Sequence, residues 1–460
     1  MNTDRIMIAA PGSGNGKTTV TCALLRTLKE RSLGVISYKC GPDYIDPMFH
    51  EKVLGIPSKN LDTFFTGETG TRELFIKGTR GKDFAVLEGA MGLYDGLGGI
   101  REEGSAYHLA KVTRTPILLV VDAKGMGRSI IPLIAGFLQY DREGLIRGVL
   151  LNRISQRYYE TIRPVIEAEL GISVAGFLPE RESFHMESRH LGLRMPDEVS
   201  GMRDKLREIS EAFAETVSVE EIIRIARNAG ELDEEPGKEI TQPRHTEPGP
   251  VIAVARDEAF CFYYADNLRL LEEYGARLCF FSPLRDAGVP EGCHALLFGG
   301  GYPELYATRL AANEGMRDSV RRAAEGGMPV VAECGGFMYM HSALTDREGV
   351  CHAMAGVLPG TCFYTGRLVR FGYVELKESK SFFLPEGGSI KGHEFHYYDS
   401  TDNGRDMIAT KPVTGKEYYC MMEDERRQMG FPHLYYPSNP AFAERFVGKA
   451  EHYGKGIGSV

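Results

Sequence analysis

Two short segments carry residue types that could do two different kinds of chemistry. Residues 11–18 read Pro-Gly-Ser-Gly-Asn-Gly-Lys-Thr and directly follow the apolar run 6–10. Residues 332–336 read Ala-Glu-Cys-Gly-Gly and directly follow the run 328–331. A glycine-rich turn that leads from a strand into a helix presents backbone N–H groups to a phosphate. A cysteine on a similar turn can act as a nucleophile.

The first segment has the context of a phosphate-binding loop. Lys17 would reach the terminal phosphates, and the Thr18 hydroxyl would ligate magnesium. The usual pattern has glycine five positions before Gly16, where this chain has Pro11, so the loop is a deviant form. We predict that ATP is bound by Gly12, Gly14, Asn15, Gly16, Lys17, Thr18 and Thr19.

Carboxylates for a magnesium ion follow two other predicted strands. Asp43 and Asp46 lie in the segment 39–47, and Glu88 ends the apolar run 84–87. In an open parallel sheet ligands gather at the carboxyl ends of the strands, and hard cations take oxygen ligands. These carboxylates could therefore converge with Thr18 on one ion. Alternatively, Asp43 and Asp46 only shape a turn through Asx hydrogen bonds.

The cysteine segment predicts a nucleophile on a strand-to-helix elbow. Small residues around Cys334 let the chain turn sharply, and the following helix N-terminus would favour the thiolate. The N–H of Gly335 could stabilise an oxyanion, with a second donor from the segment 299–304, where we select Gly301. His433 is the best candidate base by position. The other cysteines are expected to be buried structural thiols.

Together the two segments indicate an ATP-driven reaction that receives ammonia from a glutamine-hydrolysing domain. The composition agrees with a two-domain protein, because 460 residues exceed what one hydrophobic core supports. A net charge of −9 disfavours a nucleic-acid partner. The apolar runs are strand-sized, so no membrane span is expected. Nine cysteines without a CxxC pair, and no signal peptide, predict a cytoplasmic protein; a homodimer is possible.

The elements that must position these residues alternate between strands and helices. A stretch rich in Pro, Gly and charge separates the two halves, which predicts a synthetase domain at 1–230, a linker at 231–249, an amidotransferase domain at 250–447 and a tail at 448–460. Apolar runs predict strands at 6–10, 34–38, 84–87, 116–121, 146–151, 174–178, 251–255, 278–281, 295–298 and 329–332.

Helical periodicity fills most gaps between these runs, as at 18–31, 129–140 and 158–170. The alternation predicts an α/β fold class with two doubly wound, mostly parallel sheets. The N-terminal domain would be P-loop NTPase-like and the C-terminal domain flavodoxin-like. The region 350–422 has alternating residues that could add antiparallel strands.

Over nearly its whole length the chain resembles the cobalamin-pathway amidotransferases of the cobyrinic acid a,c-diamide synthase type. The resemblance rests on several segments, of which 39–47 and 392–397 (Gly-His-Glu-Phe-His-Tyr) are specific to this group. Further matching segments are 16–19, 88–96, 189–193 and 299–304. It implies an N-terminal domain that makes an acyl phosphate from ATP and a macrocycle carboxylate, and a class I glutamine amidotransferase domain that delivers ammonia.

The resemblance also implies roles for individual residues. Tyr44 and Ile45 would lie near the nucleotide base, and Asp95 would meet the macrocycle. Thr18, Asp43, Asp46 and Glu88 would serve Mg²⁺ and the phosphoryl group, while Cys334 and His433 would form the glutaminase pair. The chain departs from the family at Tyr435, where a second histidine is usual and many class I enzymes have an orienting carboxylate, so the group that orients His433 is unidentified.

Other readings share these motifs. The same chemistry could act on nickel-sirohydrochlorin or on hydrogenobyrinic acid instead of cobyrinic acid. A different class of protein, a regulatory ATPase with a non-catalytic amidotransferase-like domain, would not need to retain both Cys334 and His433.

Overall fold

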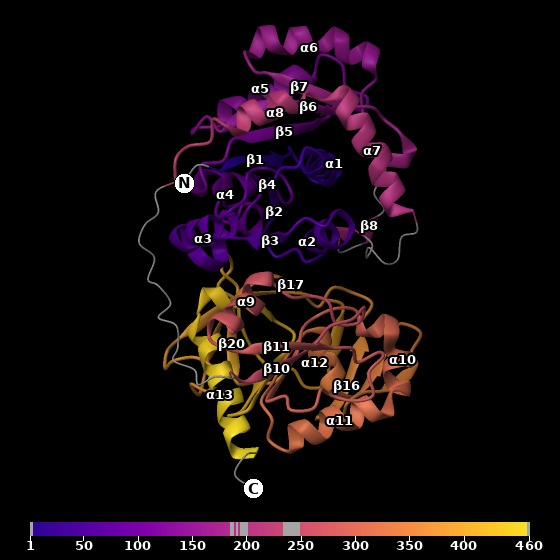
Figure 1. Ribbon diagram of the computed structural model, residues 1–460, viewed down its shortest axis with the longest axis vertical. Helices are drawn as coiled ribbons and strands as arrows, with labels where there is room; N and C mark the ends of the chain where they lie inside the picture. Colours follow the sequence, from indigo (N-terminus) through magenta and orange to yellow (C-terminus); the bar gives the residue numbers. More distant parts are fainter. Residues whose placement is uncertain (1–2, 185–187, 190–191, 194–200, 233–248, 458–460) are drawn as a thin grey trace. The chain divides into compact units, whose positions relative to one another are not determined.

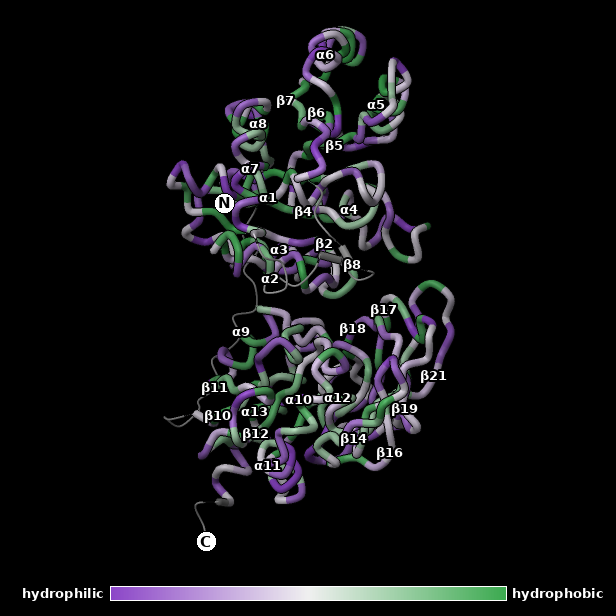
Figure 2. The backbone as a smooth tube through the Cα atoms, turned by 90° about the vertical axis from the view of Figure 1, so that its right-hand side faces the viewer, coloured by the Kyte–Doolittle hydropathy of each residue, from purple (hydrophilic) through white to green (hydrophobic). Residues whose placement is uncertain are grey.

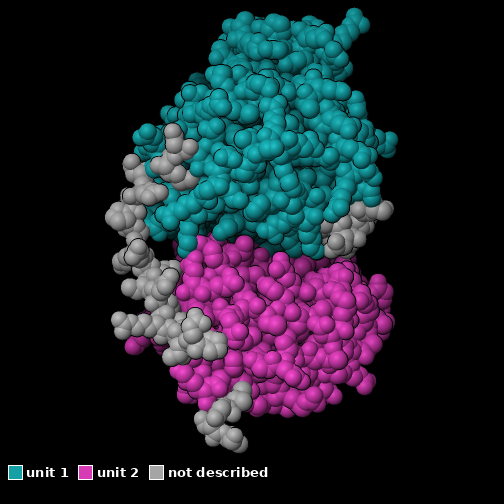
Figure 3. All heavy atoms as spheres, in the orientation of Figure 1, with its two compact units in different colours: residues 1–237 teal, residues 238–460 magenta. Residues whose placement is uncertain are grey.

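The chain divides into two compact units, residues 1–237 and 238–460 (Figure 3). The computed structural model describes residues 3–184, 188–189, 192–193, 201–232 and 249–457. The division falls inside the predicted linker 231–249, most of which lies outside the described residues.

Unit 1 is built on one parallel sheet with the strand order β3-β2-β4-β1-β5-β6-β7 (Figure 1). A short antiparallel pair, β8 and β9, lies apart from it. The strands are β1 (Asp4–Ala9), β2 (Val35–Cys40), β3 (Ser58–Leu61), β4 (Phe84–Glu88), β5 (Ile117–Asp122), β6 (Ile146–Asn152), β7 (Val174–Leu178), β8 (Ser188–Arg189) and β9 (Gly192–Leu193).

Helices cover both faces of this sheet, as the alternation in the sequence predicts. One core joins the sheet to α3, α4, α5 and α6, and α1, α7 and α8 contact β1, β2, β4, β6 and β7. The helical segments are α1 (Lys17–Glu30), α2 (Ile45–Phe49), η1 (His50–Leu54), α3 (Thr63–Thr79), η2 (Leu97–Gly99), α4 (Ala106–Val112), α5 (Ile130–Tyr140), α6 (Gln156–Leu170), η3 (Glu182–Phe184), α7 (Met202–Thr216) and α8 (Val219–Ala226).

Unit 2 has a central sheet with the order β11-β10-β12-β13-β23-β22, parallel except where β22 meets β23. Its strands are β10 (Val251–Ala255), β11 (Arg277–Phe281), β12 (Ala295–Phe298), β13 (Val330–Glu333), β22 (Met422–Glu423) and β23 (Arg427–Gly430). Two smaller sheets, β15-β14-β16-β19 and β21-β20-β17-β18-β24, flank it. Their strands are β14 (His341–Thr345), β15 (Cys351–Ala353), β16 (Leu358–Tyr364), β17 (Arg370–Glu378), β18 (Ser389–His396), β19 (Tyr398–Ser400), β20 (Met407–Thr410), β21 (Glu417–Cys420) and β24 (His433–Leu434).

Two separate cores lie on the two faces of the central sheet of unit 2. One includes residues of α10, α11 and α12, and the other includes residues of α9, α13 and the sheet of β17, β18 and β20. Helix α11 is mostly hydrophilic (Figure 2) but buries Met316, Val320 and Ala324 along one side. The helical segments are α9 (Ala265–Glu273), η5 (Pro303–Tyr306), α10 (Ala307–Ala312), α11 (Glu314–Glu325), α12 (Gly335–Met340), η6 (Tyr436–Ser438) and α13 (Ala441–Ile457).

The predicted fold class is confirmed, and the structure adds two corrections of detail. Helix α13 runs to Ile457, through the predicted domain end at residue 447, so the expected tail is helical over most of its length. Strand β3 was not predicted, because its sequence Ser-Lys-Asn-Leu lacks an apolar run. Among the residues that the structure describes, no helix combines the length and apolar character that crossing a bilayer requires.

The close approach of α12 to β12 yields a test of the fold of unit 2. A Cβ on Gly336 would lie 2.4 Å from the carbonyl oxygen of Phe298, whereas a Cβ on Gly448 in α13 would meet nothing within 4 Å. Because overpacking forces backbone shifts, we expect Gly336→Ala to lower the free energy of unfolding by about 1–3 kcal/mol. Gly448→Ala, the matched control, should raise it by up to about 1 kcal/mol.

Scanning calorimetry of both variants and the wild type measures these changes. A Gly336→Ala protein that unfolds at the wild-type temperature would contradict the close contact between α12 and β12.

Candidate active sites

The phosphate loop of unit 1 lies between β1 and α1 in a backbone conformation that favours glycine. Gly14 and Gly16 have φ values of 78° and 94°. A Cβ on Gly16 would lie 2.2 Å from Nδ2 of Asn152, so the loop also approaches the end of β6 closely. No described side chain caps the N-terminus of α1, which leaves backbone N–H groups for an anion.

Lys17 connects this loop to the loop that follows β4. Its Nζ donates hydrogen bonds to the carbonyl oxygens of Gly12, at 3.0 Å, and Met91. Burial, followed by the positive charge of Lys39, lowers the pKa of Lys17 to about 8. A bound phosphate would replace the two carbonyl oxygens with charged oxygens. A hydrogen bond from an ammonium to a charged oxygen is stronger than one to a neutral carbonyl oxygen.

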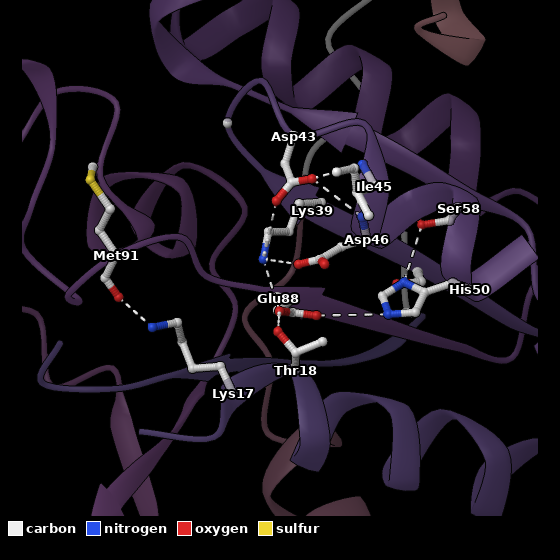
Figure 4. A network of polar contacts seen from close by, with 12 residues as sticks. Lys17, Thr18, Lys39, Asp43, Ile45, Asp46, His50, Ser58, Glu88 and Met91 are labelled. Atoms are coloured by element: carbon white, nitrogen blue, oxygen red, sulfur yellow. Dashed lines mark hydrogen bonds and ion pairs between the residues drawn. The ribbon is translucent and has the colours of Figure 1, made fainter. Parts of the chain in front are cut away.

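Glu88, at the end of β4, is the centre of a buried polar network (Figure 4). The Thr18 hydroxyl donates to Glu88 Oε1 at 2.7 Å, which brings together two residues predicted to hold magnesium. Lys39, from the end of β2, lies 2.8 Å from Glu88 and 2.5 Å from Asp46. It lies 4.0 Å from Asp43. The three predicted carboxylates therefore lie around the Lys39 ammonium, and Thr18 joins the network through Glu88; Lys39 itself was not among the predicted site residues.

Burial and neighbouring charges shift the pKa values of the groups in this network. Burial opposes the charge on Lys39, but Asp46 and Glu88 raise its pKa well above the usual value. Burial, followed by the charge of Asp46, raises the pKa of Asp43 to about 6. Burial lowers the pKa of His50 to about 4, so the imidazole that lies 3.7 Å from Glu88 is neutral. Three carboxylates thus face one buried ammonium.

The donor set fits a hard cation, although the cluster is not a complete metal site. Among the described residues, no three Asp, Glu, His or Cys side chains converge as a set of metal ligands. Glu88 Oε2 is buried and accepts no hydrogen bond from the described part of the chain. Carboxylate and hydroxyl oxygens suit Mg²⁺, which also takes ligands from substrate phosphates. That Thr18, Asp43, Asp46 and Glu88 share one ion with a nucleotide stays a prediction from the sequence.

The turn interpretation of Asp43 also holds, because its Oδ1 accepts hydrogen bonds from the backbone N–H groups of Ile45 and Asp46. Tyr44 and Ile45 are buried at the start of α2. Their expected place near the nucleotide base stays a prediction. Exposed Asp95 accepts a hydrogen bond from the N–H of Gly92 and closes its own loop. Its predicted contact with a substrate is likewise untested.

Residues at the ends of β5 and β6 hold the phosphate loop in place, and none of them was predicted as a site residue. Asn152 Nδ2 donates to the carbonyl oxygen of Asn15 at 2.8 Å, and the N–H of Asp122 donates to Asn15 Oδ1 at 3.2 Å. Arg153 pairs with Asp122 and donates to the carbonyl oxygen of Gly14. Their position directly after two predicted strands was the signal available in the sequence.

Of the segment 189–193, which matches the family, His190 and Leu191 lie outside the described residues.

In unit 2, Cys334 occupies the predicted elbow between β13 and α12. Its φ of 48° and ψ of −104° are strained for a residue with a side chain, and its N–H donates to the carbonyl oxygen of Gly430. A Cβ on Gly335 would lie 3.0 Å from the backbone nitrogen of Gly301. The two predicted oxyanion donors therefore lie on adjacent backbone segments, although their role stays a prediction.

His433 lies at the start of β24 beside the same glycine loop. A Cβ on Gly300 would lie 2.3 Å from Cε1 of His433, so the imidazole rests against the backbone next to Gly301. Burial, followed by the charge of His396, lowers the pKa of His433 to about 3. The hydroxyl of Tyr435, at the position where a second histidine was expected, lies 3.5 Å from Asp266.

Burial has a larger effect on the protonation of Cys334 than the helix start does. Burial raises the pKa of Cys334 well above its usual value, and the N–H of Gly335 lowers it by less. The helix start therefore does not produce a resting thiolate. With His433 also neutral, the pair is a thiol and an imidazole, and the proton must move as glutamine is attacked.

This protonation state predicts how Cys334 reacts with iodoacetamide when glutamine is absent. Because only the thiolate is alkylated and the thiol stays protonated, the rate should rise about tenfold per pH unit from about pH 6 to pH 9. Mass spectrometry of the Cys334 peptide measures the rate, with the exposed Cys351 as an internal control. A rate that levels off near neutral pH would indicate a thiolate–imidazolium pair instead.

Comparisons with known proteins match a family to each half of the chain. Residues 6–193 match the family described as the CobQ/CobB/MinD/ParA nucleotide binding domain. Residues 251–430 match the CobB/CobQ-like glutamine amidotransferase domain.

Relatives extend over the whole chain. It is 37% identical to the cobyrinate a,c-diamide synthase of Caldanaerobacter subterraneus subsp. tengcongensis, over 98% of this chain and 99% of that protein. It is 37% identical to the one of Listeria monocytogenes, over 97% and 100%. It is 35% identical to the one of Picrophilus torridus, over 97% and 99%. The phosphate loop, the cysteine elbow and these full-length relatives together show that the chain belongs to the cobyrinate a,c-diamide synthase family.

Proposed function

We propose that this chain catalyses the ATP- and glutamine-dependent amidation of the a- and c-carboxylates of cobyrinic acid, in cobalamin biosynthesis. One observation carries the proposal: a chain of this family joins a phosphate loop with Lys17 to a buried elbow with Cys334 beside the glycine loop that His433 contacts. Phosphoryl activation and ammonia supply are the two parts that such an amidation needs.

Unit 1 would make the carboxylate reactive. A carboxylate oxygen attacks the γ-phosphorus of ATP, the bond to the bridging oxygen breaks, and ADP leaves behind an acyl phosphate. Lys17 and the N–H groups at the start of α1 hold the phosphate oxygens. Thr18, Asp43, Asp46 and Glu88 would hold Mg²⁺, which offsets phosphate charge when bound. Tyr44 and Ile45 would border the base, and Asp95 the macrocycle.

Unit 2 would release ammonia from glutamine. The sulfur of Cys334 attacks the side-chain amide carbon while the imidazole of His433 takes the thiol proton. The N–H groups of Gly301 and Gly335 stabilise the oxyanion. The proton passes from His433 to the leaving nitrogen, and ammonia departs from a thioester, which water then hydrolyses to glutamate.

Ammonia then attacks the acyl phosphate carbon, inorganic phosphate leaves, and the amide forms. The same sequence on a second carboxylate gives the diamide. Cobyrinic acid, glutamine and ATP are thus the small-molecule partners, and Mg²⁺ the cofactor. The cytoplasmic location and the homodimer stay predictions from the sequence.

The division of labour predicts the effect of Cys334→Ser. Because a serine hydroxyl is a much weaker nucleophile without further activation, glutamine-dependent amidation should be lost. Amidation with ammonium chloride should persist at the wild-type rate, since unit 1 keeps all its groups. Product analysis by mass spectrometry with each nitrogen source makes the comparison. Loss of both activities in a folded variant would contradict this separation.

The role of Lys17 predicts a complementary result. Lys17→Ala should lower amidation with either nitrogen source by at least about 10²-fold, the loss typical for one transition-state donor. Lys29→Ala is the matched control, because this lysine lies in the same helix and bonds to the carbonyl oxygens of Leu54 and Gly55. It should keep wild-type turnover of ATP. Equal losses in the two variants would mean that Lys17 only supports the fold.

A further inference from the structure

Two histidine rings are stacked beside the glutaminase elbow. His393 of β18 and His433 of β24 are directly opposite each other in an antiparallel pair. Their ring centroids are 4.9 Å apart, and the ring planes differ by 15°. Both side chains are buried, with exposed fractions of 6% and 3%. His393 belongs to the segment 392–397, whose motif the proposed mechanism does not otherwise use.

The position of His393 is itself fixed by its neighbours. The hydroxyl of Tyr264, a buried residue just before α9, lies 3.0 Å from Nδ1 of His393. Gly392 fixes the strand pairing, because a Cβ there would lie 2.3 Å from the carbonyl oxygen of His433. The ring of Tyr264 also contacts that of Tyr435, with centroids 5.0 Å apart. A series of contacts therefore runs from Tyr264 through His393 to His433.

We propose that His393 is a positioning residue for His433. Its ring holds the imidazole of His433 against Gly300, where the base can take the proton of Cys334. Many class I amidotransferases orient the catalytic histidine with a carboxylate. This chain has Tyr435 at that position, so the stacked ring of His393 orients His433 instead. This inference rests on the proposed glutaminase activity of unit 2.

Charge in the surroundings agrees with a neutral positioning ring. Burial, followed by the nearby His433 and Lys411, holds the pKa of His393 well below its usual value. On His433, the charge of His396 lowers the pKa and that of Glu394 raises it. The Glu394 carboxylate forms ion pairs with Arg370 and Lys411 and accepts a hydrogen bond from the Tyr418 hydroxyl. His393 therefore acts on His433 through contact and shape rather than as a charged partner.

The test separates the ring face from the hydrogen bond. His393→Leu removes the flat face, His393→Phe keeps it, and Tyr264→Phe removes only the hydroxyl bound to Nδ1. His294→Ala is the matched control. The Nδ1 of His294 accepts a hydrogen bond from the N–H of Val251 in the same unit, but His294 lies before β12, at the opposite end of the parallel strands from Cys334. Each variant is first titrated with 6-diazo-5-oxonorleucine to count reactive Cys334.

A displaced base slows the reaction without weakening glutamine binding. His393→Leu should lower the glutaminase kcat per active site by about 10–100-fold with KM nearly unchanged, as expected for a misplaced catalytic group. His393→Phe should recover most of that loss, and Tyr264→Phe should have an intermediate effect. His294→Ala should keep the wild-type kcat and pH profile, and ammonia-dependent amidation should be unchanged in every variant.

Three results would overturn the proposal. These are an unchanged kcat per titrated site in His393→Leu, a loss in His393→Phe as large as in His393→Leu, or an equal loss in His294→Ala. A wild-type protein that hydrolyses no glutamine would instead overturn the proposed function of unit 2, and with it any role of His393.

Discussion

Both sites depend on one constraint: a helix starts at a glycine that lies close to a neighbouring strand. At Gly16 a Cβ would lie 2.2 Å from the side chain of Asn152, and at Gly336 it would lie 2.4 Å from the backbone of Phe298. The short distance lets α1 start at the loop that would receive phosphates. It also lets α12 start beside the strained Cys334. The same rule of sheet geometry, that sites form at the carboxyl ends of parallel strands, therefore serves two different reactions.

The two sites treat charge in opposite ways. Unit 1 concentrates charge: the Lys39 ammonium and three carboxylates lie in one polar network, and the Lys17 ammonium lies in the phosphate loop nearby, where a bound nucleotide and cation would complete the charge balance. Unit 2 removes charge from its reacting pair, because burial keeps both Cys334 and His433 neutral. Phosphoryl transfer needs fixed charges to hold phosphate oxygens. A glutaminase needs a proton to move only once the substrate has arrived, and a neutral resting pair is consistent with that requirement.

The sequence predicted much of this arrangement, because the strands at the two sites are short apolar runs followed by glycine. The strands that end near Lys17, Glu88 and Cys334 lie where these runs placed them, within one or two residues. Strand β3 was missed because buried Ser58 and Asn60 replace apolar residues, and their side chains contact His50 and the carbonyl oxygens of Gly41 and Asp43.

The central position of Lys39 and the stacking of His393 on His433 could not be predicted from the sequence. Lys39 is brought to Glu88 by the pairing of β2 with β4, and His393 to His433 by the pairing of β18 with β24. Both depend on long-range strand register, which a local pattern does not contain. The raised pKa of Cys334 could not be predicted either, because the sequence shows a helix start that favours the thiolate but not how deeply the thiol is buried.

The most direct test of the account is mass spectrometry of cobyrinic acid incubated with the purified protein, Mg-ATP and glutamine. We expect two carboxylates to be converted to amides, with ADP, inorganic phosphate and glutamate released as the amides form. If cobyrinic acid is unchanged while nickel-sirohydrochlorin or hydrogenobyrinic acid is amidated, the mechanism holds but the assigned acceptor is wrong. If none of the three is amidated with either glutamine or ammonia, the proposed synthetase activity is contradicted.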